Sequence, residues 1–312
     1  MPSWATTTMY FKKKDQYEGF KEKYCTRGNS ESKDALRFDF NKVTPMPKEL
    51  DVPSGIDGDE IMYNFLSDGL KKTLPTTGEG LIPLLEELLP GVLAFPECLD
   101  KEFINGLSYE YIVEKILKDK WNTMSETVFK DKDNDEVTKA VQFIRKMYLI
   151  FSAIRKGMKA CSTPETAESF KESMAHNNYP DSFEDNYHRG RAYVSNILKY
   201  GAPDWYEWAC YYWGTKWNAS ESKFNDEDMS VFFCSAWSIP WPVFDKIAAD
   251  NPEWEITFDS FCETDYMVTS GKFANGEASI TGRVSAYDED EDEDGADDGD
   301  PTEYSGEMDP AE

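Results

Sequence analysis

Near its N-terminus the chain reads WATTTMYF (residues 4–11), and every second side chain, namely Ala5, Thr7, Met9 and Phe11, falls on one face of an extended backbone. β-branched and aromatic residues dominate this stretch, as they do in strands that lie on a half-buried pleated surface. We therefore predict a strand with one face on a hydrophobic core.

The residues that follow predict a helix and then a second strand. Tyr17, Phe20 and Tyr24 share one helical stripe that starts after Asp15. The segment ALRFDFNKV (35–43) then alternates again, with its apolar side chains facing inward. This end of the chain is thus predicted as strand, helix, strand.

The C-terminal part returns to the same chemistry. Its predicted order is a strand, a helix with Pro242 near its start, a further strand and a hairpin, from the stretches SVFFCSAW (230–237), PWPVFDKIAADNP (240–252), EWEITFDSF (253–261), YMVTSGKF (266–273) and EASITGRV (277–284). Asn275-Gly276 between alternating segments is a strong hairpin signal. Two such strand–helix–strand units indicate an α+β fold with a split β-α-β antiparallel sheet of the ferredoxin-like kind.

Between the two ends the apolar period becomes helical. The clearest case is DEVTKAVQFIRKMYLIFSAIRKGM (135–158), and weaker helical patterns cover 78–91, 101–121, 164–176 and 184–200. We predict a discontinuous α+β domain from 1–50 and 205–286, a large all-helical insertion at 51–204, and an acidic tail at 287–312. The tail has too little apolar surface to offset the entropy of ordering, so it is predicted to be disordered.

The net charge is −27, and residues 288–312 supply about half of it with 14 acidic residues and no basic one. Duplex binding needs a Lys/Arg surface, so direct nucleic-acid binding is not expected. A protein with a basic surface is the expected partner. The candidate partner-binding residues in the tail form one acidic run: Asp288, Glu289, Asp290, Glu291, Asp292, Glu293 and Asp294.

Metal, cofactor and membrane chemistry have little support. Six cysteines are scattered without a C-x-x-C pair, and the chain has two histidines, so free thiols and no zinc site are expected. The stretch 131–142 imitates a calcium loop but has Glu136 and Gln142 where a glycine and a glutamate are needed. No apolar run of about 18 residues and no secretory signal pattern occurs, which predicts a cytoplasmic protein.

Several motifs occur in a specific order: MPSWATT at the start, FDFNKVTPMPKEL (38–50), WYEWACYYWGTKWNA (205–219), AWSIPWPVFDKIA (236–248) and GKFANGE (271–277). Together they resemble the YubB ferredoxin-like family, a domain of unknown function in bacteriophage and conjugative-plasmid proteins. Ser3-Trp4-Ala5 stands where that family usually has Asn-Trp-Cys. The resemblance implies the fold and an origin in a mobile element within a bacterial host, and it implies no catalytic residues.

The tryptophan-rich corner has two interpretations. The functional one is a ligand- or partner-binding cup with aromatic walls and a few polar groups, formed by Trp213, Thr215, Lys216, Trp217, Asn218 and Trp237. The structural one is a helix-to-strand corner in which Gly214 adopts a positive φ and the indoles close one end of the sheet. In that case a buried Lys216 would need a partner such as Asp204 or Glu207.

Three functional hypotheses follow from these features. The first is a non-enzymatic accessory protein that binds a host protein and inhibits a host defence or nucleic-acid-processing system, with its acidic surface as a mimic of nucleic-acid charge. The second is an enzyme or small-ligand module with its site at the WGTKWN corner and with Lys216 and a carboxylate as reactive groups. The third is a virion-associated structural protein.

Overall fold

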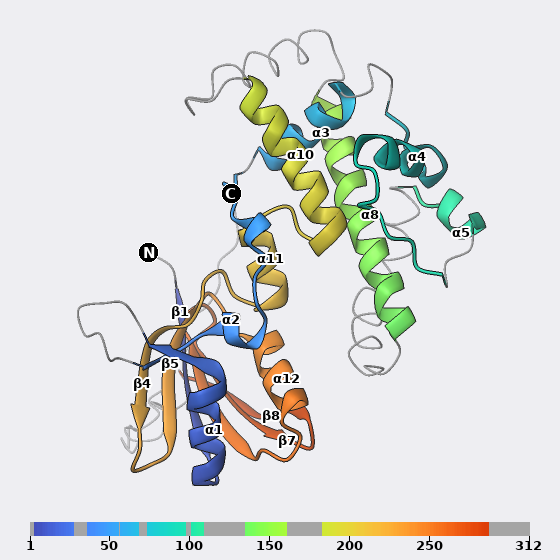
Figure 1. Cartoon of the computed structure of the whole chain (residues 1–312). Helices are drawn as coiled ribbons and strands as arrows, with labels where there is room; N and C mark the ends of the chain where they lie inside the picture. The colour runs from blue at the N-terminus through green and yellow to red at the C-terminus, as the bar shows by residue number, and fades with distance from the viewer. Residues whose placement is uncertain are drawn as a thin grey trace, which may run out of the picture.

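The computed structural model describes most of the chain, namely residues 3–27, 36–55, 57–68, 74–97, 101–108, 135–160 and 183–286. These residues form an α+β protein, as predicted. A sheet with its covering helices occupies one part of the molecule, and a group of helices from the middle of the chain lies beside it (Figure 1).

The main sheet is antiparallel and has six strands in the order β4-β5-β1-β6-β7-β8. Their bounds are β1 Trp4–Phe11, β4 Ser220–Asn225, β5 Ser230–Ala236, β6 Ile256–Cys262, β7 Met267–Ala274 and β8 Glu277–Ser285. The N-terminal strand β1 pairs with β5 on one side and β6 on the other, so that Thr7 lies opposite both Phe233 and Ser260. The two ends of the chain therefore build one sheet.

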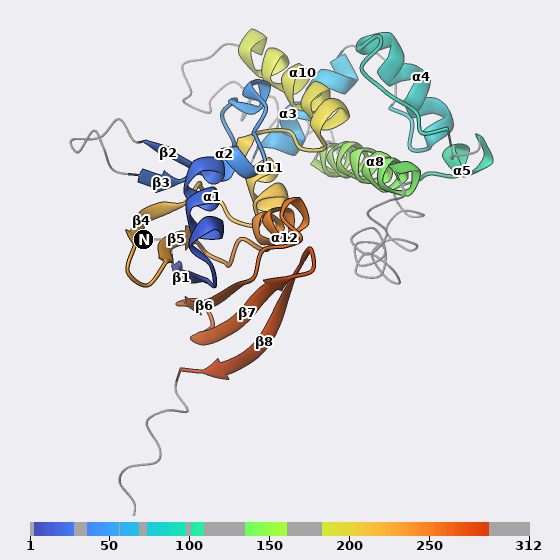
Figure 2. The ribbon, with the colours of Figure 1, turned by 60° about the horizontal axis from the view of Figure 1, so that its bottom comes forward.

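Helix α12 (Trp241–Asp250) connects β5 to β6, and these two strands run parallel to each other because each is antiparallel to β1 between them. The helix begins after Pro240 and has Pro242 in its first turn, where the missing N–H of proline costs nothing. Helices α12 and α1 (Lys14–Tyr24) lie on the same side of the sheet (Figure 2). The predicted helix at 240–252 is confirmed.

Strands β7 and β8 form the predicted hairpin. Asn275 and Gly276 between them have φ values of 55° and 81°. A two-residue turn with both φ angles positive matches the twist of the flanking strands, and asparagine and glycine tolerate this conformation best. The hairpin extends the sheet beyond β6.

The strand predicted over residues 35–43 is wrong in part. Among the described residues of this stretch, Leu36–Phe38 form a strand (β3), which pairs with β2 (Cys25–Arg27) in a separate two-stranded sheet. From Phe40 the chain forms the short helix α2 (Phe40–Val43), because the Asp39 side chain accepts a hydrogen bond from the Asn41 N–H and caps that helix. The strand next to β5 in the main sheet is instead β4, which follows the helical segment.

The core beneath the sheet is unusually aromatic. Phe20 from α1, Phe38 from β3 and Phe244 from α12 are all fully buried, and Phe244 lies 4.9 Å from Phe258 of β6 between ring centres. The inward-facing residues of WATTTMYF contribute as predicted, with Ala5, Thr7, Met9 and Phe11 buried. Side chains from both chain ends thus share this core, and the corner at residues 205–220 packs against it.

The middle of the chain forms a second core from helices and the segments that connect them. Its described helices are α3 (Gly58–Asp68), α4 (Gly78–Leu88), α5 (Lys101–Asn105), α8 (Asp135–Ala160) and α10 (Phe183–Tyr200), whereas Leu50 of the preceding η1 (Lys48–Leu50) belongs to the sheet core. Helix α3 contacts both α8 and α10. A Cβ at Gly190 of α10 would lie 2.5 Å from the carbonyl oxygen of Ile61, so glycine permits this close helix crossing.

Several predictions fall outside the described residues. They are the helix at 164–176, most of 101–121, the first part of the calcium-like stretch, and the acidic tail from residue 287 with its run from Asp288 to Asp294. Within the described part of the chain, no helix combines the length and apolarity needed to cross a bilayer.

Candidate functional site

The tryptophan-rich stretch forms helix α11 (Trp205–Tyr212) and the corner that leads into β4. Asp204 caps the helix, since its Oδ1 accepts a hydrogen bond of 3.0 Å from the Glu207 N–H. After the helix, Gly214 has φ 73°, and a Cβ there would lie 2.6 Å from Cδ of Pro242. The positive φ predicted for this glycine is confirmed, and it turns the chain against the start of α12.

Two residues of the predicted site point inward and hold the corner in place. The buried indole of Trp213 donates a hydrogen bond of 2.9 Å to the carbonyl of Thr44. The buried hydroxyl of Thr215 donates a bond of 2.7 Å to the carbonyl of Ala236 at the end of β5. Each of these buried side-chain donors therefore has a backbone carbonyl of the sheet region as its hydrogen-bond acceptor.

Asn218 also makes hydrogen bonds that hold the corner in place. Its Oδ1 accepts hydrogen bonds of 2.8 Å from the backbone N–H groups of Phe40 and Ala219. Its Nδ2 donates a bond of 2.7 Å to Oδ1 of Asp39, the residue that caps α2. One amide thus connects the start of β4 to α2 across 178 residues of sequence.

The other three predicted residues lie at the surface. Trp217 is 38% exposed and Trp237 is 50% exposed. The amine of Lys216 lies 4.8 Å from the ring centre of Trp217 and 5.4 Å from that of Tyr206, which is itself 37% exposed. We call Tyr206, Lys216, Trp217 and Trp237 the aromatic corner. It replaces the predicted cup, because Trp213 is turned into the core and Tyr206 lies at the surface instead.

Trp237 has a conformation that needs an explanation. Its φ is 73°, in the left-handed region that costs a residue with a side chain about 1–2 kcal/mol. Its N–H donates to Ser3 and its carbonyl accepts from the hydroxyl of Thr264, so both neighbouring strand ends fix the backbone. Glycine would fit this position at lower cost, yet the chain places a half-exposed indole there.

A shallow hollow of about 420 Å³ lies within the aromatic corner, lined by Tyr206, Lys216 and Trp237 together with Cys210. Cys210 is a free thiol at the surface. Desolvation of the sulfur, followed by the nearby Glu207 carboxylate, raises the pKa of the Cys210 thiol above its usual value. The thiolate is the nucleophilic form, so this environment disfavours covalent chemistry at Cys210 near neutral pH.

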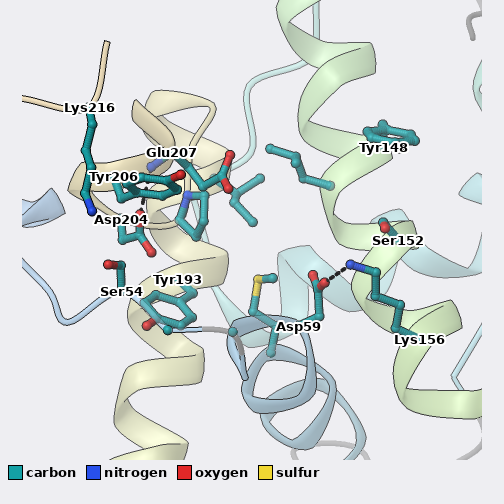
Figure 3. Close-up of a pocket in the computed structure, with 16 residues that line it drawn as sticks. Ser54, Asp59, Tyr148, Ser152, Lys156, Tyr193, Asp204, Tyr206, Glu207 and Lys216 are labelled. Carbon is teal, nitrogen blue, oxygen red and sulfur yellow. Dashed lines mark hydrogen bonds and ion pairs between the residues drawn. The ribbon is translucent and has the colours of Figure 1, made fainter. Parts of the chain in front are cut away.

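A larger cavity of about 590 Å³ shares Tyr206 and Lys216 with the shallow hollow and extends from α11 to α3, α8 and α10 (Figure 3). We call it the inter-helix cavity. Its apolar lining residues are Met62, Leu149, Ile197 and Pro203. Its polar lining residues are Ser54, Asp59, Tyr148, Ser152, Lys156, Tyr193, Asp204, Tyr206, Glu207 and Lys216.

The charged groups of the inter-helix cavity differ in whether they have an ion-pair or hydrogen-bond partner. Asp59 and Lys156 form an ion pair at one end (Figure 3). Asp204 is only 5% exposed, and burial raises the pKa of its carboxyl although backbone N–H groups stabilise the charge. Within the described residues, neither Glu207 nor Lys216 forms an ion pair, although Asp204 and Glu207, the partners expected for a buried Lys216, line the same cavity as this partly exposed lysine.

Sequence reasoning missed the part of this cavity that the middle of the chain supplies. Tyr148, Ser152 and Lys156 are spaced by four residues along α8 and so share one face, but this helix carries many other polar residues and the spacing alone does not mark a site. Ser54 and Asp59 gave no signal, because nothing local shows that these segments lie opposite residue 216. Among the described residues, no group of three or more His, Cys, Asp or Glu side chains is placed to hold a metal ion.

Comparison with known proteins adds little. No protein-family model and no curated protein matches the chain. Among solved structures it is similar to the crystal structure of a protein api92 from Yersinia pseudotuberculosis, described by the family model DUF1281, with 12% identity over 92% of this chain and 99% of that one. The TM-score is 0.33, which is too low to support an argument about fold or function.

Proposed function

We propose that this chain is an accessory protein of a bacteriophage or conjugative plasmid that acts in the host cytoplasm by binding a host protein with a basic surface. Through this contact it inhibits a defence or nucleic-acid-processing system. The observation that carries the binding part of the proposal is the aromatic corner, where a strained backbone presents the half-exposed indole of Trp237.

The order of elements supports a ferredoxin-like domain of the YubB type. Strands and helices of the sheet region follow one another as β1-α1-β4-β5-α12-β6, with the strand order β4-β5-β1-β6. This order supports a split β-α-β arrangement of the ferredoxin-like kind, with β2, β3, α2, the helical segment and α11 placed before β4 and the β7–β8 hairpin added at one edge. The mobile-element origin rests on the sequence resemblance alone.

The chemistry of the aromatic corner favours a protein as the binding partner. Tyrosine and tryptophan offer large contact areas with few rotatable bonds, and they are enriched among the residues that dominate binding energy in interfaces. Carboxylates border the corner, with Glu207 next to Tyr206 and Glu263 bonded to the backbone of Trp4. Together with the net charge of −27, they favour a basic surface on the partner.

The test is affinity capture from host lysate with the tagged full-length chain, at low and at moderate salt. The test variant is Trp237→Asn, since asparagine tolerates a positive φ and the fold should persist. The matched control is Tyr10→Asn, which removes an exposed aromatic residue from the end of β1 that is far from Trp237. We expect capture by the wild type and the control, weaker capture as salt rises, and loss of about tenfold or more for Trp237→Asn.

Two outcomes would refute the proposal. One is that the wild type retains no host protein at either salt concentration. The other is that Trp237→Asn retains the same proteins in the same amounts as the wild type, which would show that the aromatic corner takes no part in the contact.

A further inference from the structure

We propose that the inter-helix cavity is a binding site for a small zwitterion, specifically an amino acid with a large apolar side chain. This inference deepens the small-ligand hypothesis for the WGTKWN corner. It does not depend on the protein-binding role proposed above, because a small ligand needs no partner protein and Trp237, which tests that role, does not line this cavity, although Tyr206 and Lys216 belong to both sites.

The charges that remain after pairing define the ligand class. Asp59 is neutralised by Lys156, and Asp204 is occupied as the helix cap. Lys216, which is partly exposed, and Glu207, which is exposed, are a cation and an anion on the same wall that form no ion pair with each other and are open to a ligand. A ligand that satisfies both must carry a carboxylate and an ammonium group, whereas a ligand with a single charge would satisfy only one.

Lys216 is oriented by aromatic rings rather than by a carboxylate. Its amine lies near the ring faces of Tyr206 and Trp217, which attract a cation without cancelling its charge. Figure 3 shows this amine directed to the side where Ser54 and Asp204 lie, while Glu207 points from the same wall toward the middle of the cavity. The two charged groups lie on either side of Tyr206, so the backbone of a bound amino acid would lie against this ring with its carboxylate toward Lys216 and its ammonium group toward Glu207.

The apolar part of the lining suits an apolar side chain. It consists of Met62, Leu149, Ile197 and Pro203, which come from α3, α8, α10 and the segment before α11. A volume of about 590 Å³ lies within the range typical of small-molecule sites, roughly 300–1,000 Å³. This space accommodates the largest apolar side chains, so an aromatic amino acid is the best probe.

Calorimetric titration of the purified full-length chain tests the idea with three related ligands. L-tryptophan carries both charged groups, tryptamine lacks the carboxylate, and indole-3-propionate lacks the ammonium group. We expect L-tryptophan to bind and each analogue to bind about tenfold or more weakly, since each leaves one charged wall residue without a partner.

Two variants assign each charge to its residue. Lys216→Met should weaken L-tryptophan and indole-3-propionate but leave tryptamine unchanged, and Glu207→Gln should weaken L-tryptophan and tryptamine but leave indole-3-propionate unchanged. The matched controls are Lys42→Met and Glu227→Gln, at exposed positions outside the cavity. Both controls should bind all three ligands as the wild type does, and circular dichroism verifies that every variant is folded.

The proposal is overturned if L-tryptophan gives no binding heat at millimolar concentration, or if the three ligands bind equally well. It is also overturned if folded Lys216→Met and Glu207→Gln proteins bind L-tryptophan as tightly as the wild type. None of these results bears on capture of a host protein, so the two proposals fail independently.

Discussion

Replacing Asn218 with alanine separates a structural role of this residue from a ligand-binding one. The side chain makes two hydrogen bonds to backbone N–H groups and one to the Asp39 carboxylate. A neutral hydrogen bond contributes about 1 kcal/mol and one to a charged group about 2 kcal/mol, and the Phe40 N–H would be left without its acceptor. We expect Asn218→Ala to lower the free energy of unfolding by about 3–4 kcal/mol.

Urea denaturation, monitored by tryptophan fluorescence, measures this loss of stability in the sheet region. Eight of the nine tryptophans lie in or next to the sheet region, and Trp121 falls outside the described residues, so the signal reports mainly on that region. Asn225→Ala is the matched control, because the Asn225 side chain bonds only within an exposed turn, and it should lose no more than about 1 kcal/mol. A loss of less than about 1 kcal/mol for Asn218→Ala would refute the structural role and leave the amide free to bind a ligand.

Asn218→Asp tests the same structural role by placing a negative charge at this position. The shape and both accepted hydrogen bonds are retained, but a second carboxylate then faces Asp39. Like charges raise the pKa values of the pair in the folded state above their unfolded values near 4. Such a pair destabilises the fold at neutral pH, and stability recovers as pH falls and one carboxylate takes up a proton. A variant whose stability relative to wild type is independent of pH would contradict this geometry.

Three further changes probe the frame around the site. Asp204→Asn keeps the helix cap and removes a buried charge. Because the folded-state pKa of Asp204 is raised, the free energy of unfolding of the wild type should increase as pH falls toward about 4. Urea titrations at several pH values should show that the variant lacks this increase. Gly190→Ala places a Cβ against Ile61 and should cost about 2–3 kcal/mol in far-UV melts of the helices. Trp213→Phe loses the bond to Thr44 and some packing, for about 2 kcal/mol in urea.

The fold was predictable where the signal was local. Alternation in WATTTMYF and the Asn275-Gly276 turn depend on neighbouring residues only, and both were confirmed. The strand predicted at 35–43 failed because the Asp39 side chain competes with strand pairing by capping α2. The inward positions of Phe38 and Phe40 survived the error, since burial of these rings does not depend on whether the backbone is strand or helix.

The site was less predictable because its contacts join distant segments. The motif located the corner and the turn at Gly214, but nothing near Trp213 in sequence shows that its indole N–H finds an acceptor at Thr44, 169 residues away. The same holds for the inter-helix cavity, where Lys216 shares a lining with Asp59 and Ser152 from the middle of the chain. Patterns of spacing identify elements, whereas a cavity depends on how separate elements meet.

The WGTKWN motif divides its residues between two tasks, and the first task makes the second possible. Trp213, Thr215 and Asn218 each bond to a different part of the sheet region, which leaves the backbone between them little freedom. Lys216 and Trp217 lie on that constrained backbone and are partly exposed. A backbone that is already fixed loses less conformational entropy on binding, so the internal hydrogen bonds of the motif lower the cost of any contact that its surface residues make.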